Sequence, residues 1–469
     1  MKLSGKDTIA AIATPLGEGG ISVIRISGAQ ALSVADKIFK GTAPLSMVGS
    51  HTAHFGRVRD RDEYTVDEVV ATVFLGPNSF TGENTVEISC HGGLLVSQRI
   101  LELILREGAR HAEPGEFTKR AFLNGKLDLS QAEAVADLIH ARSDLAHRSS
   151  VRQLEGILSG RIHQLRSNLV DAIGLLELEL DFVEEGLEFV DKKDFRQKVV
   201  ETINEIDRLL ESFSAGRIYR EGVKVVIAGP PNAGKSSLLN ALLESNRAIV
   251  TDIPGTTRDT IEESVNIGGV SFKLVDTAGL RETHDAVERE GVKRTEKEAR
   301  TGDIVMLVID ASKGAADERY EKIRELASDL ALTSDKVIYA LNKSDLPSRP
   351  PSQVLGPLVF GKDAKYVEIS AKTGLGLDRL QKMLVKCAFS GKEPGNESAA
   401  TVTNLRHYDA LERARESLIL SLDSLDEKQS GEFVAVDLRN ALDRLGEITG
   451  EVTSEEILNT IFSKFCIGK

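Results

Sequence analysis

The sequence predicts a multidomain protein of mixed class: an α+β domain at the N-terminus, then a helical domain into which an α/β domain is inserted. Three observations predict this. Short apolar runs alternate with turn residues near the N-terminus, apolar residues recur at helical spacing on both sides of residues 222–389, and strand-like and helix-like segments alternate within that range. A chain of 469 residues is also too long for one hydrophobic core, and typical domain sizes predict about three domains.

The expected N-terminal α+β domain covers residues 1–127. Its apolar stretches at 21–26, 69–75 and 86–88 are separated by Gly, Pro and Asn, which indicates strands joined by turns. Residues 94–105 have the spacing of a helix. We therefore expect a compact sheet with at least one helix packed on it.

The helical domain is expected in two parts, residues 128–216 and 390–469. Ser130-Gln-Ala-Glu133 has the spelling of a capping box, so a long helix should begin there. The apolar residues that continue it at helical spacing are Val135, Leu138, Ala141 and Leu145. The same spacing recurs in the ranges 154–180, 203–213, 411–425 and 434–448. Each set alone would leave an apolar stripe exposed, so we expect one helical domain interrupted by residues 217–389.

A phosphate-binding motif lies at the start of the inserted domain. Gly229-Pro-Pro-Asn-Ala-Gly-Lys-Ser236 follows a strand expected at 224–228 and precedes a helix-like segment at 237–243, which is the context that such a loop requires. Backbone N–H groups would surround the phosphates, Lys235 would reach the β and γ oxygens, and Ser236 would bind Mg²⁺. The segment therefore predicts a P-loop.

Further motifs at strand ends predict guanine specificity. Asp276-Thr-Ala-Gly279 follows a strand expected at 272–275, so that Asp276 can hold the Mg²⁺ shell and the Gly279 N–H can sense the γ-phosphate. After the next expected strands, at 304–309 and 337–341, comes Asn342-Lys-Ser-Asp345, whose Asp345 can accept hydrogen bonds from guanine N1–H and N2–H₂. Adenine lacks that pair of donors.

A strand expected at 366–369 completes this domain, and the Ser370-Ala-Lys372 that follows it is expected to support the base. These motifs in this order predict a P-loop GTPase domain of the Ras-like type. The expected GTP-binding residues are Gly229, Asn232, Ala233, Gly234, Lys235, Ser236, Ser237, Thr251, Thr256, Thr257, Asp276, Gly279, Asn342, Lys343, Asp345, Ser370, Ala371 and Lys372.

The first switch is expected at Thr251-Asp-Ile-Pro-Gly-Thr-Thr-Arg-Asp259, where threonine hydroxyls could complete a cation site; the alternative is a simple turn. In Ras-like proteins a glutamine after the Asp-x-x-Gly motif orients the attacking water, but here that residue is Leu280. Glu288, in the expected second switch, is the nearest plausible carboxylate, although it could belong to a solvated face. With no obvious arginine finger, Asn232 could hold a monovalent cation against the phosphates.

Composition limits the remaining classes. The net charge of −13 means that the surface as a whole repels a polyanion, so any contact with nucleic acid must be local. Cys90, Cys387 and Cys466 are odd in number and far apart, which favours a reducing compartment over a disulfide framework. We find no secretory h-region and no run of 18 apolar residues, so a cytoplasmic protein without a membrane span is expected.

The chain resembles the tRNA-modification GTPases of the MnmE (TrmE) family over essentially its full length. Within the GTPase domain the resemblance is carried by the P-loop, the first switch and Asp276-Thr-Ala-Gly-Leu-Arg281. Outside that domain it is carried by Ala13-Thr-Pro, Gly19-Gly-Ile-Ser-Val-Ile-Arg-Ile-Ser-Gly28, Pro77-Asn-Ser-Phe-Thr-Gly-Glu83, His91-Gly-Gly, Pro114-Gly-Glu-Phe-Thr-Lys-Arg-Ala-Phe-Leu-Asn124 and Phe465-Cys-Ile-Gly-Lys469.

The resemblance implies a homodimer through the N-terminal domains and K⁺-stimulated pairing of the GTPase domains. It implies Mg²⁺ held by Ser236 and Thr257, and Glu288 as the catalytic carboxylate. The K⁺ ligands that it implies are Asn232, Thr256 and the backbone carbonyls of Thr251 and Ile253.

In the N-terminal domain the resemblance implies a site for 5-formyltetrahydrofolate or a related one-carbon donor. The matching residues are Arg25, Glu87, Lys126 and Lys469. A hetero-oligomer with an FAD-containing partner of the MnmG (GidA) type would add an aminomethyl or carboxymethylaminomethyl group to C5 of the wobble uridine of certain tRNAs. Cys466 looks important for this modification among family members.

Other readings of these residues remain. Arg25 could simply reach solvent, Glu87 could be an ordinary strand carboxylate, and Cys466 could be a structural thiol. Two other functions remain as well. One is a regulatory or ribosome-assembly GTPase that binds RNA without modifying it, and the other is a dynamin-like scaffold at a membrane.

Overall fold

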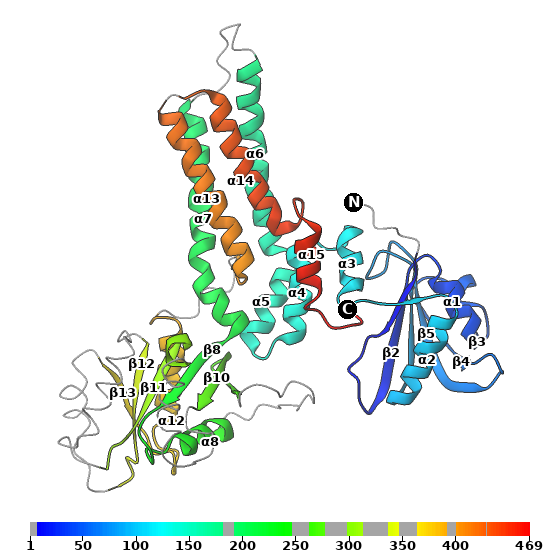
Figure 1. Ribbon diagram of the computed structural model, residues 1–469, viewed down its shortest axis with the longest axis horizontal. Helices are drawn as coiled ribbons and strands as arrows, with labels where there is room; N and C mark the ends of the chain where they lie inside the picture. The colour runs from blue at the N-terminus through cyan, green and yellow to red at the C-terminus, as the bar shows by residue number, and fades with distance from the viewer. Residues whose placement is uncertain are drawn as a thin grey trace, which may run out of the picture. The chain divides into compact units, whose positions relative to one another are not determined.

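The computed structural model describes residues 7–181, 192–245, 262–276, 298–312, 336–346, 364–391, 400–427 and 429–469 (Figure 1). The chain divides into two compact units. One comprises Met1–Ala136, Gln153–Ile203 and Arg413–Lys469, and the other comprises Asp137–Arg152 and Asn204–Glu412. Each unit contains one sheet together with helical segments.

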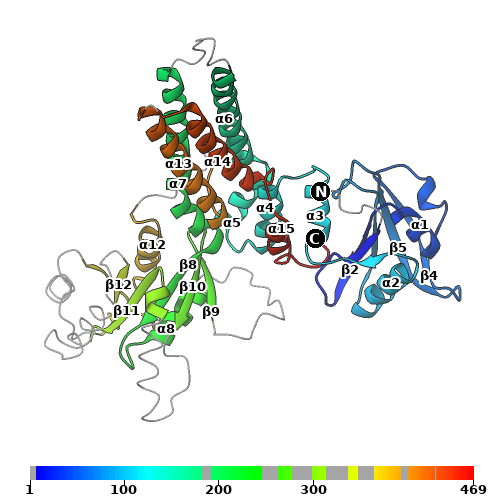
Figure 2. The same cartoon turned by 45° about the horizontal axis from the view of Figure 1, so that its top comes forward.

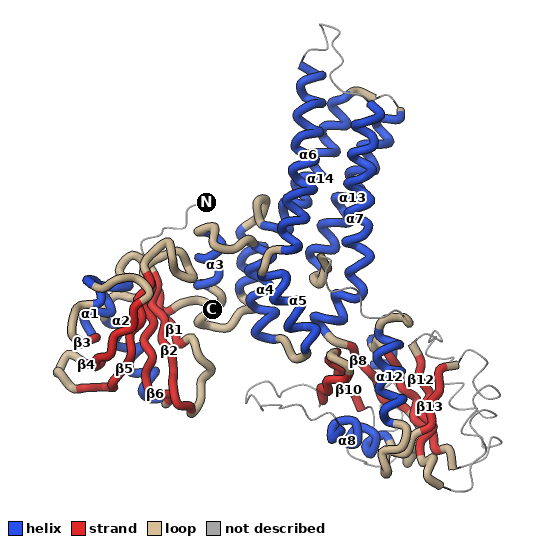
Figure 3. The backbone as a smooth tube through the Cα atoms, turned by 180° about the vertical axis from the view of Figure 1, so that it is seen from behind, coloured by secondary structure: helices blue, strands red, loops and turns tan. Residues whose placement is uncertain are grey.

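The first unit contains a seven-stranded sheet in the order β3-β4-β5-β6-β2-β1-β7. The strands are β1 (Ile9–Ile12), β2 (Gly19–Ser27), β3 (Phe39–Gly41), β4 (Thr52–Arg59), β5 (Thr65–Phe74), β6 (Thr85–Gly92) and β7 (Arg110–His111). Helices α1 (Ala31–Ile38) and α2 (Leu94–Arg106) pack on one face of it, with Ile38, Ile100 and Ile104 in the shared core. Figure 3, seen from behind, shows the strands in front of both helices. The predicted strands at 21–26, 69–75 and 86–88 and the predicted helix at 94–105 are confirmed.

Helix α3 (Glu116–Leu123) receives the C-terminal residues of the chain. The Gly115 N–H donates to the Cys466 carbonyl at 3.5 Å, and the Phe117 N–H donates to the Lys469 carbonyl at 3.2 Å. Helix α15 (Glu455–Phe462) packs beside α3, with the rings of Phe122 and Phe462 6.5 Å apart. The last residues are thereby fixed against the N-terminal part of the protein.

A network of charged side chains fixes α3 in turn. Arg120, which is 8% exposed, donates to Glu116 at 2.9 Å, to Glu83 at 3.1 Å and to Asp7 at 2.9 Å. Arg110 donates to Glu116 at 2.6 Å and to Asp7 at 2.8 Å. Because each buried charge has an opposite charge within hydrogen-bond distance, the network can stay ionised.

Helix α4 (Leu129–His140) begins differently from the prediction. The predicted cap at Ser130 is wrong, because Ser130 is buried inside the helix with its hydroxyl 3.0 Å from that of Ser159. The reciprocal capping bonds join Asp128 and Gln131: each side-chain oxygen accepts the backbone N–H of the other residue, at 2.9 and 3.0 Å. The capping box therefore lies two residues earlier in the chain.

The predicted single helix through Leu145 is also wrong. Helix α4 ends at His140 and α5 (Asp144–Leu154) begins after a short break. Ser143 provides the physical reason, since its hydroxyl accepts the Ala146 N–H at 3.2 Å and thus caps a new helix.

The longer helices are α6 (Ile157–Asp181), α7 (Lys192–Glu221), α13 (Leu405–Asp426) and α14 (Gly431–Thr449). They match the four ranges with predicted helical spacing, except that Leu154 at the start of the first range belongs to α5 and is separated from α6 by a turn. In the first unit α6 and α14 lie side by side (Figure 2), and Arg166 of α6 donates to the Leu442 carbonyl of α14 and to Glu451. In the second unit, Phe213 of α7 packs against Tyr408 of α13, with ring centroids 4.7 Å apart. Helix α7 continues past the expected domain boundary at residue 216 and ends at Glu221.

The second unit contains a six-stranded sheet in the order β13-β12-β11-β8-β10-β9. The strands are β8 (Val223–Ala228), β9 (Glu262–Ile267), β10 (Val270–Asp276), β11 (Ile304–Asp310), β12 (Val337–Asn342) and β13 (Lys365–Glu368). All neighbours are parallel except β9, which forms an antiparallel hairpin with β10. Every strand predicted in this range is confirmed, although β13 ends at Glu368 rather than Ile369.

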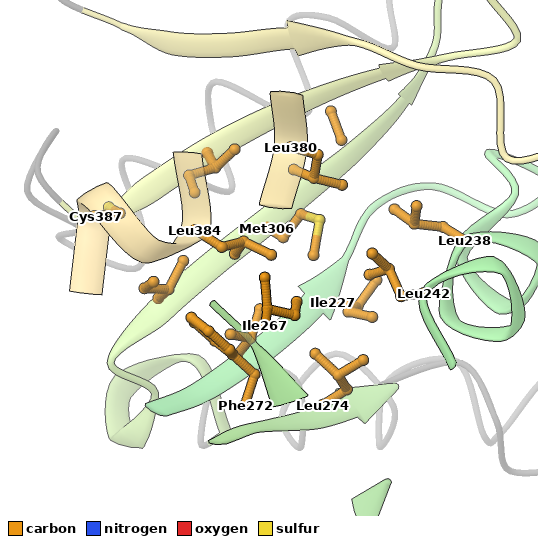
Figure 4. Close-up of a cluster of buried hydrophobic side chains, with 14 of the residues drawn as sticks. Ile227, Leu238, Leu242, Ile267, Phe272, Leu274, Met306, Leu380, Leu384 and Cys387 are labelled. Atoms are coloured by element: carbon orange, nitrogen blue, oxygen red, sulfur yellow. The ribbon is translucent and has the colours of Figure 1, made fainter. Parts of the chain in front are cut away.

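Helices α8 (Lys235–Ser245) and α12 (Leu377–Ala388) pack on the same face of this sheet. Figure 4 shows Leu238 and Leu242 of α8, and Leu380 and Leu384 of α12, gathered over Phe272, Met306 and neighbouring strand residues. Strands β8, β11 and β12 are buried over nearly their whole length, and their sequences are therefore nearly continuous apolar runs, as expected for central parallel strands.

Candidate nucleotide-binding site

The carboxyl ends of the parallel strands of the second unit meet at one edge of the sheet. Strand β8 lies between β10 and β11. After β8, the chain first forms β9 and β10 on one side of it and then forms β11 on its other side. Ligands of open α/β sheets bind at such a point, outside the carboxyl ends of the strands. The loops that follow β8, β10, β12 and β13 there are the ones predicted to bind GTP.

The loop between β8 and α8 requires glycine where the motif has it. Gly229 has φ 145°, and a Cβ there would lie 2.3 Å from the Val308 carbonyl oxygen. Gly234 has φ 93°, and its Cβ would lie 2.2 Å from the Asn342 amide nitrogen. The backbone is thus held close to β11 and β12 in a conformation that L-residues rarely adopt. Asn232, at the exposed tip of the loop, also has a positive φ of 63°.

Lys235 begins α8 and folds back over the loop. Its Nζ donates to the carbonyls of Gly229 and Pro230 at 2.9 and 3.0 Å. Burial lowers the pKa of Lys235, and the nearby negative charge of Asp276 only partly opposes this effect. The ammonium is therefore held by neutral carbonyls, which phosphate oxygens can replace with stronger charge-assisted bonds.

Ser236 and Asp276 form a pair of oxygen ligands beside the loop. The exposed Ser236 hydroxyl donates to Asp276 Oδ2 at 3.1 Å. A hydroxyl and a carboxylate at this separation, with water and phosphate oxygens completing the shell, suit the hard Mg²⁺ ion. Ser237, the next residue of α8, is exposed.

Asn342 links the phosphate loop to the base loop. Its buried side-chain amide donates to the Ala233 carbonyl at 2.8 Å, and its side-chain carbonyl accepts the Ala371 N–H at 2.9 Å. Asn342 is predicted to contact the nucleotide, and in the structure its side-chain amide also joins two protein loops. A buried amide with both ends bonded fixes their spacing.

Asp345 lies in the loop after β12 and is exposed. A hydrogen bond from Ser370 and the positive charge of Lys372 hold the pKa of Asp345 below its ordinary value of 3.8. The loops that carry them are joined by the Ser344 N–H, which donates to the Ile369 carbonyl at 3.0 Å. Asp345 is consequently an ionised acceptor, suited to two neighbouring donors on one edge of a base.

The structure brings together the P-loop residues, Asp276, Asn342, Lys343, Asp345 and the Ser370–Ala371–Lys372 loop. Lys343 donates to Asp310, which was not among the residues predicted from the sequence although a carboxylate at the end of a strand is a visible signal. The remaining predicted residues lie outside the described residues: Thr251, Ile253, Thr256, Thr257, Gly279 and Glu288.

The residues expected to bind folate lie in the first unit. Arg25 of β2 stands opposite Glu87 of β6 in the strand register, and the two side chains form an ion pair at 2.7 Å. The Arg25 guanidinium lies over the rings of Phe80 and Phe117, at 5.2 and 5.5 Å. With 13% of its side chain exposed, Arg25 does not simply extend into solvent.

The C-terminal residue completes this group. Burial and the positive charge of Arg25 lower the pKa of Lys469, while Glu87 opposes the shift, so the three charged groups are close together. Lys126 lies beside the loop that carries Phe80, since a Cβ on Gly82 would be 3.4 Å from its Cγ. Within the described chain, the buried Arg25 Nη1 has no hydrogen-bond partner. A carboxylate or carbonyl of a ligand would satisfy it.

The cysteines differ in environment. Cys466 is exposed, and its carbonyl accepts the Gly115 N–H. Cys90 and Cys387 are buried, and burial together with the charge of Asp67 raises the pKa of Cys90 to about 11. Cys466 is therefore the accessible thiol of the described chain, and it stands three residues from Lys469.

A domain with this strand order and these loops is a P-loop GTPase domain of the Ras-like type, carried here beside an α+β domain and a helical domain. Two family models match the chain: "GTP-binding protein TrmE N-terminus" over residues 8–126 and "MnmE helical domain" over residues 129–466. The chain belongs to the MnmE (TrmE) family.

Curated relatives support the assignment over the full length. The protein named tRNA modification GTPase MnmE from Thermoanaerobacter pseudethanolicus is 44% identical over 99% of both chains. The protein of that name from Chlorobium phaeobacteroides is 46% identical over 99% of this chain and 97% of its own. Among solved structures, the G domain of the FeoB iron transporter of T. maritima is 27% identical, covering 35% of this chain and 98% of its own at a TM-score of 0.27.

Within the described ranges, every helix is too short or too polar to span a membrane.

Proposed function

We propose that this chain hydrolyses GTP and that it takes part in tRNA modification. The observation that carries the first part is Asn342, which joins the phosphate-binding loop to the loops that present Asp345. One rigid unit can thus hold a triphosphate at one end and a guanine at the other. The names of the full-length relatives support the second part.

Only a few groups of the protein would take part in GTP hydrolysis. When bound, Mg²⁺ would neutralise charge on the β and γ oxygens. Ser236 and Thr257 would hold the ion, with Asp276 in its shell, and Lys235 would stabilise the charge that develops between the phosphates. Glu288 would orient the attacking water, a role that Leu280 at the usual glutamine position cannot fill. GTP turnover measured against ATP turnover tests the proposal, and a preference for ATP would contradict it.

K⁺ is proposed as the cation that replaces an arginine finger. Asn232 and Thr256 would bind it with the backbone carbonyls of Thr251 and Ile253. The exposed tip position of Asn232 supports this, since a cation there could contact both the loop and a second GTPase domain.

The N-terminal domain is proposed to bind 5-formyltetrahydrofolate or a related one-carbon donor. The buried, unpartnered Nη1 of Arg25, the Phe80 and Phe117 rings beneath it, and Lys469 beside it form a plausible surface for an acidic ligand with a flat ring. Glu87 and Lys126 complete the proposed set.

Replacing Arg25 by Ala should weaken binding of labelled 5-formyltetrahydrofolate to the full-length protein by about tenfold or more, because a charge-assisted bond and its aromatic backing are lost. Equilibrium dialysis would measure it. Arg57→Ala is a matched control, since Arg57 pairs with the exposed Glu68 on another strand of the same sheet. Equal affinity in all three proteins would remove Arg25 from the proposed site, and absence of binding to the wild-type protein would remove the folate proposal.

The protein is further proposed to act as a homodimer in the cytoplasm, in a hetero-oligomer with an FAD-containing MnmG (GidA)-type partner. Phe55 and Val70, paired across β4 and β5 and 65% and 39% exposed, support self-association of the N-terminal sheet. Together with folate, the complex would modify C5 of the wobble uridine. Mass spectrometry of tRNA nucleosides from cells lacking the protein tests this role, and unchanged wobble uridines would favour a regulatory or ribosome-assembly GTPase.

A further inference from the structure

Asp310 is the last residue of β11 and stands at the edge of the sheet where the nucleotide is proposed to bind. In the register of β11 and β12 it lies opposite Asn342, and the Ala311 N–H donates to the Asn342 carbonyl at 2.9 Å. Asp310 is thus next to the segment that leads to Asp345, although no nucleotide-binding motif includes it.

Both oxygens of the Asp310 carboxylate are engaged. Oδ1 accepts the Ser312 N–H at 3.1 Å and the Ser312 hydroxyl at 2.6 Å, while Oδ2 accepts Lys343 Nζ at 2.7 Å. Burial tends to raise the pKa of Asp310, but the bonds from Lys343 and Ser312 outweigh it and keep the pKa low. Ser312 therefore orients a charged carboxylate, and that carboxylate holds the lysine.

Lys343 is fixed at both ends. Its backbone has φ 63°, an uncommon conformation for a residue other than glycine, and its ammonium is held by Asp310. Its side chain is 35% exposed and that of Asp310 is 15% exposed, so the pair is only partly accessible to water. Lys343 stands two residues before Asp345 in the same loop, and the four-carbon stem of a lysine offers an apolar surface to a flat ring.

We propose that Asp310 is a positioning residue, which holds Lys343 so that the lysine stem forms one wall of the guanine site before the nucleotide arrives. This inference rests on the proposed GTP-binding function. Preorganisation of this kind acts on affinity, because a free lysine would have to lose its rotamer freedom on binding. Asp310 itself need not touch the nucleotide.

The test compares Asp310→Asn with the wild-type full-length protein. Asparagine keeps the shape and an acceptor for Ser312 but cannot pair with the ammonium. We expect the Kd for GDP to rise by about tenfold, mainly through faster dissociation. The preference for GDP over IDP should stay unchanged, because IDP lacks only the N2 amino group that Asp345 reads. The kcat at saturating GTP should also be retained.

A double-mutant cycle asks whether Asp310 acts through the lysine. Lys343→Met keeps much of the stem but removes the ammonium, so adding Asp310→Asn to it should cause little further loss of GDP affinity. Asp303→Asn is the matched control. Asp303 lies at the other end of β11, where it accepts Arg217 at 2.7 Å and the Lys224 N–H at 2.9 Å, and its loss should leave the Kd unchanged.

Two results would overturn the inference: a wild-type Kd in a folded Asp310→Asn protein, or losses that add fully in the double mutant. Thermal unfolding of each variant establishes that it is folded. If Asp310→Asn does not fold, the Lys343→Met protein decides alone, and unchanged GDP affinity there overturns the inference. A wild-type protein that fails to prefer GDP to ADP would instead refute the proposed function itself.

Discussion

Asn342 and Asp345 share one motif but have different roles in the structure. Both polar ends of the Asn342 side chain are bonded to protein, to the Ala233 carbonyl and the Ala371 N–H. The Asp345 carboxylate is exposed and kept ionised by Ser370 and Lys372. We therefore propose that Asp345 selects the base and that Asn342 sets the distance between that carboxylate and the phosphate-binding loop.

Replacing Asp345 by Asn should change which base is accepted. The asparagine amide can donate to the C2 carbonyl of xanthine, whereas it places a donor against the guanine N2 amino group. GDP affinity should fall by about 100-fold or more, because a site built for hydrogen bonding rejects a mismatched partner strongly, and XDP affinity should rise. Competition of GDP and XDP for the purified protein measures both changes, and undiminished GDP binding would place base selection elsewhere.

At the scale of elements, α3 joins two segments that are remote in sequence. Its N-terminal N–H groups hold the C-terminal tail, and Glu116 and Arg120 bind it to the network around Asp7 and Glu83. Burial would raise the pKa of Glu116, but hydrogen bonds from Arg110, the Glu113 N–H and Arg120 outweigh it and leave the pKa below 4.5. The folded state thus favours the ionised carboxylate.

Because the pKa of Glu116 is lower in the folded state than its ordinary value of 4.5, ionisation of Glu116 stabilises the fold at pH values above 4.5. This stabilisation is lost as the pH falls through the folded-state pKa. The free energy of unfolding should therefore drop as the pH is taken below about 4.5. Glu116→Gln should lower stability at pH 7 by about 3 kcal/mol, as for the loss of one partner in a buried ion pair, and should flatten this acid dependence. Denaturant titrations at several pH values would show it. Parallel pH curves for the two proteins would exclude Glu116 as the source.

Periodicity located the long helices and the central strands, because their apolar faces are wide and their burial is continuous. The elements that it missed include β1, β3 and β7, which are too short to show a period, and β9, whose polar sequence forms a strand by pairing with β10. It also misplaced the start of α4, since Ser130 and Asp128 both begin cap-like spellings and only burial distinguishes them. Local sequence does not contain that information.

At the scale of the molecule, motif spacing predicted where the phosphate and base loops would meet, because parallel strands bring their carboxyl ends to one edge. It could not predict from the residues alone that Lys469 lies beside Arg25 and Glu87, or that the tail rests on α3. Those contacts join opposite ends of the chain. The family resemblance suggested the first of them, whereas the contact of the tail with α3 was not predicted.

The proposed pairing of two GTPase domains around K⁺ leads to a prediction for the whole assembly. GTP turnover should be at least about tenfold faster in K⁺ than in Na⁺ at equal ionic strength, because the larger ion would replace an arginine finger at the phosphates. Steady-state phosphate release measures it. Equal rates in the two salts would remove the cation mechanism.

Glu288→Ala should nearly abolish turnover in K⁺ while GTP binding stays intact, because the water would lose its orienting carboxylate. Filter binding alongside the phosphate assay separates the two effects. Preserved turnover would mean that Glu288 is an ordinary surface carboxylate and not the catalytic residue.

The amide of Asn342 fixes the distance between the two loops that are proposed to form the phosphate and base subsites, with Ala233 on one side and Ala371 on the other. A fragment that fills only one subsite, such as guanosine or pyrophosphate, gains no binding energy from the other subsite. The intact nucleotide gains from both at once. Affinity in such a pocket should therefore depend far more steeply on the covalent link between base and phosphates than on either piece.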